Sequence, residues 1–142
     1  MSLVHNKKIH LEYSIEDKQV FGVELLGTEV KSLRKSQGSL DGAKVAVVSG
    51  QLYLLGSYIP AYQEKNALNF DAYKSRKLLA NKKEINDLVM MKHGENLQIF
   101  PIGFFDKGGL IKLECGIGKR LKKQDKRQVI RDKDDHRKGI DL

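Results

Sequence analysis

The alternation of apolar and polar residues near the start of the chain predicts β-structure. Over residues 8–16, KIHLEYSIE, every second residue from Ile9 to Ile15 is apolar, as in a strand with one side on a core and the other in solvent. Residues 20–26, VFGVELL, predict a second strand, and the polar pair at 17–18 lies near the turn between the two. The chain therefore begins with two adjacent strands.

A hairpin is predicted in the middle of the chain. Residues 43–59, AKVAVVSGQLYLLGSYI, contain two apolar runs that are divided by Ser49 and Gly50. This dipeptide favours a tight turn with positive φ angles between antiparallel strands. Pro60 ends the hairpin, because proline cannot donate a hydrogen bond to a strand ladder.

Two more strands are predicted near residue 100. The runs 96–105, NLQIFPIGFF, and 110–118, LIKLECGIG, are joined by the turn sequence DKGG. We expect the second run to supply core side chains, which are Leu110, Ile111, Leu113 and Cys115.

A short helix is predicted over residues 28–36. Thr28 can cap its first turn, and no Gly or Pro follows until Gly38. Val30 and Leu33 are three residues apart and share an apolar face, while the adjacent face carries the cations Lys31 and Arg34.

A longer helix is predicted over residues 75–92, after a loop at 61–74 with weak periodicity. Ser75 is a plausible cap and Gly94 ends the helix. Its apolar stripe consists of Leu78, Ile85, Leu88 and Val89.

Five or six short antiparallel strands with helices are typical of a small, partly open barrel such as the OB fold, which often binds nucleic acid. We therefore predict a mainly β protein, an OB-like antiparallel β-barrel with two to three flanking helices. An unrelated α+β sandwich would give a similar pattern.

Charge divides the chain into two parts. The 142 residues carry a net charge of +8, and the last 24 residues alone contribute +5 of it. We predict one barrel domain over residues 1–118 and a basic tail over 119–142, disordered when free and able to become helical against a polyanion. A solubilising tail without a partner is the alternative. A basic domain of this kind favours nucleic acid as the partner.

Other protein classes are disfavoured by the composition. We find no run of about 18 apolar residues and no apolar signal segment at the start, so neither a membrane span nor secretion is expected. Cys115 is the single cysteine, which excludes an internal disulfide and fits a reducing compartment.

Catalytic signatures are missing from the sequence. The four histidines do not show metal-ligand spacing with Cys115, and GIGK at 116–119 lacks the spacer and the hydroxyl residue of a phosphate-binding loop. We predict no catalytic residue, no metal and no cofactor.

Several stretches together resemble the SsrA-binding protein family, the protein partners of transfer-messenger RNA. EVKSLR and RKLL are specific as a pair at their observed separation. The matching pieces, in the family's order, are NKKIHLEYSI (6–15), GTEVKSLR (27–34), LYLLGSYIPAY (52–62), SRKLLANKKEI (75–85), IKLECGIGK (111–119) and DKR (125–127).

The resemblance implies a cytoplasmic bacterial protein that catalyses nothing itself. It would bind the tRNA-like domain of transfer-messenger RNA and help to deliver this RNA to stalled ribosomes for trans-translation. Elongation factor Tu and alanyl-tRNA synthetase would be indirect partners, and the chain would act as a monomer. The alternatives are a divergent binder of structured RNA without ribosome rescue, and an enzyme or ribosome-associated scaffold with a similar barrel.

The resemblance also implies site residues. Val30 and Leu33 would face the barrel and leave Lys31 and Arg34 beside the RNA. The RNA-binding set is Lys31, Arg34, Lys74, Arg76, Lys77, Leu79, Lys112, Lys119 and Arg120. The tail set, placed against ribosomal RNA near the A site and the messenger channel, is Lys122, Lys123, Asp125, Lys126, Arg127 and Arg131.

The chain also departs from the family pattern. Val20 and Phe21 stand where the family usually has a Glu before its early glycine, and DAYKSRKLL stands where the family has D-P-T-R-T-R-K-L-L.

Overall fold

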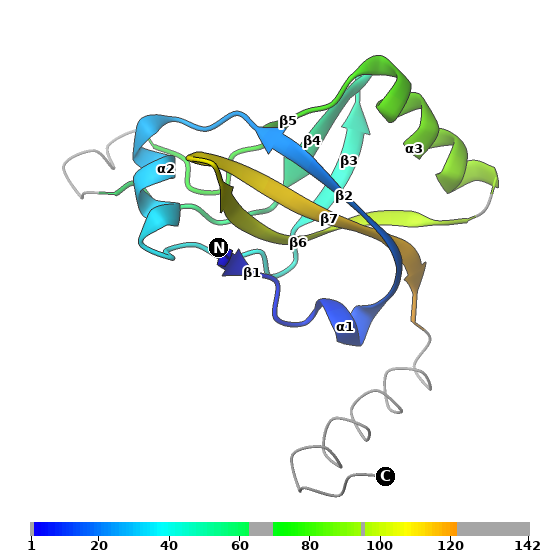
Figure 1. Ribbon diagram of the computed structural model, residues 1–142, viewed down its shortest axis with the longest axis horizontal. Coiled ribbons are helices and arrows are strands. Elements are labelled where there is room, and N and C mark those ends of the chain that lie inside the picture. Colours follow the sequence, from blue (N-terminus) through cyan, green and yellow to red (C-terminus); the bar gives the residue numbers. More distant parts are fainter. Residues whose placement is uncertain (1, 63–69, 95, 122–142) are drawn as a thin grey trace, which may run out of the picture.

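The computed structural model describes residues 2–62, 70–94 and 96–121. Within these residues the chain forms seven strands and three helices (Figure 1). In chain order they are β1 (Ser2–His5), α1 (Ile9–Glu12), β2 (Tyr13–Val23), α2 (Gly27–Arg34), β3 (Lys44–Val48), β4 (Gln51–Leu55), β5 (Arg76–Leu79), α3 (Lys82–Gly94), β6 (Gln98–Lys107) and β7 (Leu110–Arg120).

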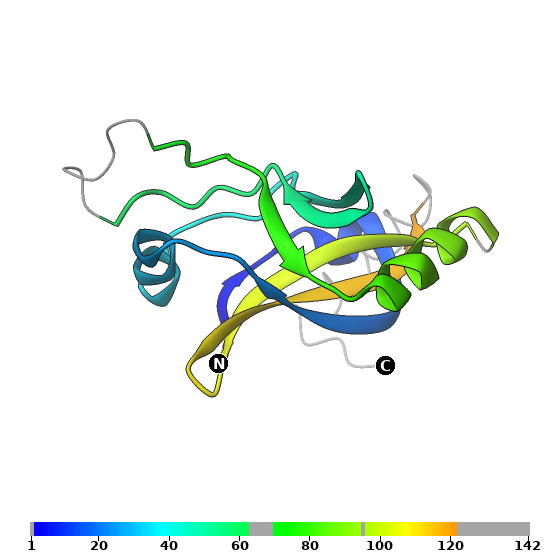
Figure 2. The ribbon, with the colours of Figure 1, turned by 90° about the horizontal axis from the view of Figure 1, so that it is seen from above.

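The strands form one antiparallel sheet in the order β1-β6-β7-β2-β5-β4-β3. The sheet curls so that β3 approaches β6, but these two strands are not paired and the barrel stays open at this seam (Figure 2). The mainly β, partly open barrel predicted from the sequence is therefore confirmed, with more strands than the five or six expected.

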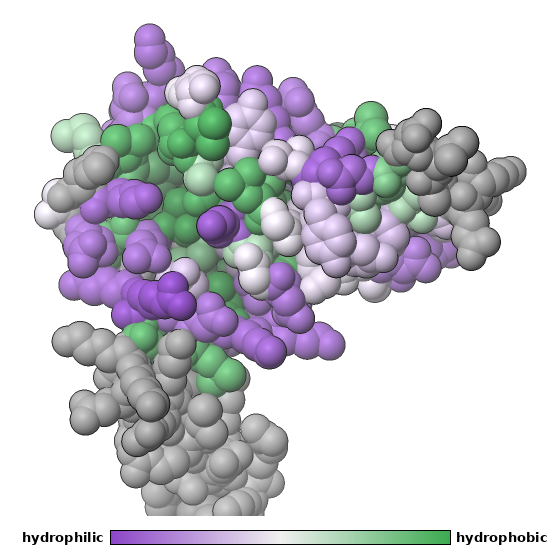
Figure 3. Space-filling model, turned by 180° about the vertical axis from the view of Figure 1, so that it is seen from behind, coloured by the Kyte–Doolittle hydropathy of each residue, from purple (hydrophilic) through white to green (hydrophobic). Residues whose placement is uncertain are grey.

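The open seam leaves a groove of about 680 Å³ between β3, α3 and β6. Its lining includes Val45, Val47, Leu88 and Ile99, and Val47 remains 38% exposed. Figure 3 shows an apolar area with hydrophilic residues around it on the face that lies behind Figure 1. Closure of the barrel would have covered these side chains.

The core lies inside the curled sheet and is made by strand residues that alternate with exposed ones. Phe21 and Leu113 are cross-strand partners on this inner face and are 2% and 0% exposed. Cys115 fills the core as a small apolar group, and burial raises the pKa of its thiol. Leu110 was expected in the core but is 65% exposed, because it directly follows the β6–β7 turn.

The first strand differs from the prediction. Residues Ile9–Glu12 form the short helix α1, and β2 then runs without a turn from Tyr13 to Val23. The polar pair at 17–18 lies in the strand opposite Ile117 and Gly116, directly after a bulge between Ile15 and Asp17. The Asp17 carboxylate accepts the Lys18 N–H at 2.8 Å, which is a local contact typical of turns. Four alternating residues could not distinguish a helical turn from a strand.

The helix predicted from residue 75 begins seven residues later. Arg76–Leu79 form β5, which pairs with β2 and β4. The helix α3 begins at Lys82, where Asn81 and Glu84 cap each other: Asn81 Oδ1 accepts the Glu84 N–H at 2.8 Å, and Glu84 Oε1 accepts the Asn81 N–H at 2.9 Å. Ile85 and Leu88 are buried as predicted, while Leu78 is buried from the strand.

The hairpin prediction is confirmed. β3 and β4 pair from Lys44 opposite Leu55 to Val48 opposite Gln51. The turn residues Ser49 and Gly50 have φ angles of 51° and 76°, the positive values that this tight turn requires. The short strand β1 was missed, since four residues give too little pattern.

No helix among the described residues has the length and apolar character needed to cross a membrane.

Candidate nucleic-acid interface

The helix α2 begins with a carboxylate that is fully buried. Glu29 Oε1 accepts the Leu26 N–H at 2.7 Å, so its side chain caps the helix in place of the expected Thr28. Glu29 is 0% exposed, and a charge at this depth needs a partner to offset its loss of hydration.

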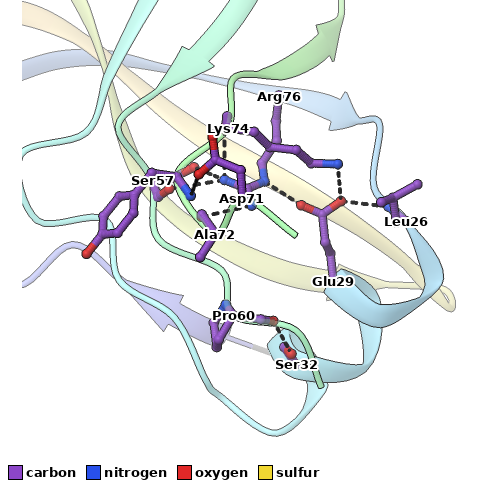
Figure 4. Close-up of polar contacts among 10 residues, drawn as sticks. Leu26, Glu29, Ser32, Ser57, Pro60, Asp71, Ala72, Lys74 and Arg76 are labelled. Carbon is purple, nitrogen blue, oxygen red and sulfur yellow. Dashed lines mark hydrogen bonds and ion pairs between the residues drawn. The ribbon is translucent and has the colours of Figure 1, made fainter. Parts of the chain in front are cut away.

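Arg76 supplies that partner from β5. Its Nε donates to Glu29 Oε2 at 2.6 Å, and Arg76 itself is 1% exposed (Figure 4). The other guanidinium nitrogens donate at 3.0 Å to the backbone oxygens of Ser57, Ala72 and Lys74 and to the Ser57 hydroxyl. We call this Glu29–Arg76 ion pair the clasp. Each guanidinium nitrogen of Arg76 therefore donates at least one hydrogen bond within the protein.

The clasp lies at the base of a loop. We call residues 57–62 and 70–75 the aromatic loop, because they carry Tyr58, Tyr62, Phe70 and Tyr73. The α2 side chains also hold this loop: the Ser32 hydroxyl donates to the Pro60 oxygen at 2.6 Å, and Thr28 Oγ1 accepts the Tyr62 N–H at 2.7 Å. Thr28 therefore holds the loop instead of capping the helix.

The predicted cations of α2 differ in their contacts. Leu33 packs into the core and Val30 is half-buried against it, as expected, and Lys31 and Arg34 lie on the solvent side. Arg34 pairs with Asp106 and donates to the Gly109 oxygen at 2.9 Å. The Arg34 guanidinium holds the pKa of the Asp106 carboxyl below its ordinary value. The charge of Arg34 is thus partly offset at the β6–β7 turn.

Two lysines lie near aromatic rings of the loop. Lys31 Nζ lies 6.0 Å from the centre of the Tyr62 ring, and Lys74 Nζ lies 5.7 Å from that of Phe70. Lys74 Nζ is also 3.5 Å from Glu29 Oε1, with 34% of its side chain exposed. Lys74 therefore adds positive charge at the surface directly above the clasp.

Strand alternation separates the residues of the RKLL motif. Arg76 and Leu78 face the interior, whereas Lys77 and Leu79 face outward. Leu79 is 52% exposed, so the structure places it at the surface.

Leu79 belongs to a continuous surface of β5, β2 and β7. Gly22 of β2 is opposite Leu79 on one side and Lys112 on the other, so the three residues share one face. Two residues away, Val20 is opposite Glu114 and is 44% exposed. We call this surface the outer face; its residues are Val20, Gly22, Lys77, Leu79, Lys112 and Glu114.

Lys74 and Lys77 line a shallow groove of about 450 Å³ next to the outer face. Its floor includes both residues of the clasp, and Tyr53 contributes an aromatic wall. Lys112 carries the positive charge at the other side of the outer face. An apolar centre with lysines around it can bind phosphates through the cations and base faces through the exposed carbons.

Lys119 and Arg120 end β7 and are exposed, so the last strand extends two residues past the expected domain boundary. Arg120 lines the seam groove, away from the outer-face residues of β7. The Leu121 N–H donates to the Glu12 oxygen at 2.9 Å and ties the end of β7 to α1. The tail set at 122–131 lies outside the described residues.

The structure thus brings Lys74, Lys77, Leu79 and Lys112 together and separates them from Arg120. Residue-by-residue reasoning missed the exposed Val20 and Tyr73. Tyr73 lies in a segment interpreted only as a loop, where its aromatic content was the available signal. No group of three His, Cys, Asp or Glu side chains suited to a metal occurs in the described parts of the chain.

Comparison with known proteins gives one family model, described as SmpB protein, that matches residues 3–140. An SsrA-binding protein of Lactobacillus acidophilus is 36% identical over 135 residues, which are 95% of this chain and 89% of that protein. An SsrA-binding protein of Thermosipho africanus is 37% identical over 134 residues, covering 94% and 90% of the two chains.

A solved structure is similar in fold as well as sequence. The work that describes it is "tmRNA-SmpB: a journey to the center of the bacterial ribosome". Its matching chain superposes with a TM-score of 0.69 at 28% identity, over 92% of this chain and 96% of that chain.

Proposed function

Because the chain belongs to the SmpB protein family, we propose that it binds the tRNA-like domain of transfer-messenger RNA and delivers that RNA to stalled ribosomes for trans-translation. The observation that carries this proposal is the family match over residues 3–140, together with similarity to a chain from a tmRNA–SmpB ribosome study. The partners are thus transfer-messenger RNA and the ribosome.

The outer face is the proposed contact surface for the RNA. Lys77 and Lys112 would neutralise phosphates on either side of Leu79, and the exposed Leu79 side chain would lie against an unstacked base. Lys74 extends the positive charge toward α2. Lys31 adds a further cation near the RNA, while Arg34 contributes less because Asp106 offsets its charge.

The basic segment after β7 is the proposed ribosome contact. Lys119 and Arg120 would begin it, and Lys122, Lys123, Asp125, Lys126, Arg127 and Arg131 would continue it along ribosomal RNA in the messenger channel. Elongation factor Tu and alanyl-tRNA synthetase would act on the same RNA without a required contact to this chain. We further propose that the protein is cytoplasmic, monomeric and without catalytic activity of its own.

A gel-shift titration with the tRNA-like domain tests the RNA half of the proposal. We expect binding that is tight, strongly salt-dependent and stronger than binding to an unrelated structured RNA of equal length. Equal affinity for both RNAs would remove the claim of specificity.

Removal of residues 122–142 tests the ribosome half. Because β7 and the Leu121 contact stay intact, the shortened chain should keep most of its RNA affinity and lose tagging of stalled products. Tagging that survives the deletion would show that the tail set has no part in rescue.

A further inference from the structure

The aromatic loop presents an exposed ring that the family motifs do not explain. Tyr73 is 63% exposed, and its ring centre lies 5.0 Å from that of Tyr58 at an angle of 47°. Tyr73 lies in the stretch DAYKSRKLL, directly before Lys74 and close to the RKLL motif. A tyrosine ring that another ring already holds on one side has little conformational freedom left. Binding therefore loses little entropy when it immobilises this ring.

Local contacts fix the backbone of Tyr73. Asp71 Oδ1 accepts the Tyr73 N–H at 2.9 Å, and the backbone oxygen of Asp71 accepts the Lys74 N–H at 3.3 Å. These contacts form a tight turn that directs the side chain to solvent. The Asp71 carboxylate is thereby occupied within the loop, beside the positive charge of Lys74.

The clasp holds both ends of the loop at once. Arg76 binds Ser57 at the beginning of the loop and Ala72 and Lys74 at its end, all at 3.0 Å. Ser57 and Arg76 are 0% and 1% exposed, so water does not compete for these bonds. Tyr73 lies between two of the residues that Arg76 fixes.

We propose that Tyr73 is a stacking platform for an unstacked base of the bound RNA, and that Arg76 is a positioning residue that acts through it. Lys74, next in the chain and above the clasp, would bind the phosphate of the same nucleotide. This inference rests on the proposed function. It assigns the buried Arg76 no contact with RNA, although its sequence motif suggested one.

The first test compares Tyr73→Ala with Tyr73→Phe in binding to the tRNA-like domain. The Ala variant should bind about 5- to 100-fold more weakly, while the Phe variant, which keeps the ring, stays near wild type. The salt slope should not change in either variant, because tyrosine is uncharged. The control is Met90→Ala, which shortens a 71% exposed side chain on α3 and should have no effect.

The second test is a double-mutant cycle with Arg76→Lys, which keeps the charge but cannot make the same fork of bonds. If Arg76 acts through Tyr73, the loss of affinity in the Arg76→Lys/Tyr73→Ala variant is smaller than the sum of the losses in the two single variants. Losses that add would mean that Arg76 meets the RNA itself and would overturn the positioning role. Circular dichroism confirms that each variant is folded.

Ultraviolet crosslinking of the wild-type complex gives a readout that needs no variant. A crosslinked peptide that contains Tyr73 is expected, and crosslinks confined to other residues would overturn the platform even if affinity falls in the Ala variant. Wild-type protein that does not bind the RNA domain would refute the proposed function itself. Wild-type binding with an unaffected Tyr73→Ala variant would refute only this inference.

Discussion

Two neighbouring residues of one motif, Arg76 and Lys77, lie in opposite environments. Arg76 is 1% exposed and its charge is matched by Glu29 at 2.6 Å. Lys77 faces outward beside an apolar surface that includes Leu79, and no salt bridge to it occurs among the described residues. The positive charge of Arg76 therefore stabilises the fold through Glu29, whereas the positive charge of Lys77 stays available to a polyanion.

The difference between the clasp and the outer face teaches how to interpret a basic motif. A buried guanidinium with several directed hydrogen bonds stabilises only its own surroundings. Its charge is paired with a carboxylate inside the protein, so it adds little to the electrostatic potential at the surface. A lysine whose apolar stem lies along a sheet keeps its ammonium group in water. Burial, and not membership of the motif, decides which cation can reach RNA.

The largest expected effect comes from breaking the clasp. Arg76→Met removes the buried partner of Glu29 and leaves only the partly exposed Lys74, 3.5 Å from the carboxylate, so it should reduce the free energy of unfolding by about 3 kcal/mol. Urea unfolding followed by circular dichroism measures this loss. The matched control is Lys77→Met, which should change stability by about 0.5 kcal/mol or less. Equal losses in the two variants would erase the contrast between the clasp and the outer face.

The next effect sharpens the role of the outer face. Lys77→Ala combined with Lys112→Ala should weaken binding of the tRNA-like domain by about 2 kcal/mol in total. The slope of log K against log salt should fall by roughly 1.4–1.8, as two phosphate contacts are lost. Filter binding at several salt concentrations measures both quantities. An unchanged slope would place the RNA on another surface.

A smaller effect is expected from Gly22, between Leu79 and Lys112. A Cβ added to Gly22 would lie 3.1 Å from Leu79 Cδ1, and this flexible side-chain end can shift. Gly22→Ala should therefore leave stability within about 1 kcal/mol of wild type but weaken RNA binding a few-fold, because Leu79 is displaced. Thermal melts and the gel shift separate the two. Wild-type affinity in this variant would argue against a contact between Leu79 and a base.

The smallest effect concerns the Arg34–Asp106 pair, which is exposed. Because Arg34 lowers the pKa of Asp106 in the folded state, the pair contributes stability above the carboxyl's ordinary pKa and loses it as pH falls through the lower, folded value. The melting temperatures of wild type and Arg34→Ala should differ slightly at pH 7 and converge below about pH 4. A difference that grows in acid would contradict this assignment.

The sequence predicted the elements whose pattern is long or whose turn chemistry is specific. The β3–β4 hairpin followed from Ser49 and Gly50, and the short helix followed from Val30 and Leu33. The periodicity could not show that Leu78 is buried from a strand, because Leu78 also fits the helical stripe of Ile85 and Leu88. The pairing of β5 with β2 and β4 is a tertiary effect.

The candidate site shows the same limit. The cationic residues of the candidate site were proposed from the sequence, but the partner of Arg76 was not, because Glu29 lies 47 positions away in the chain. Glu29 makes a local bond to Leu26 at the start of α2 and a distant bond to Arg76 of β5. The spacing of residues near Glu29 predicts its bond to Leu26 but contains no signal for its bond to Arg76.

The hydrogen bond between the Leu121 N–H and the Glu12 oxygen holds the end of β7 against α1. The segment that follows Leu121 starts from a point held by α1, near the other end of the sequence, and not from a free strand end. The position of Leu121 therefore sets the distance between the surface that would hold RNA and the first tail residue. A change at Glu12 or in α1 would then shift where the tail starts without altering a single tail residue.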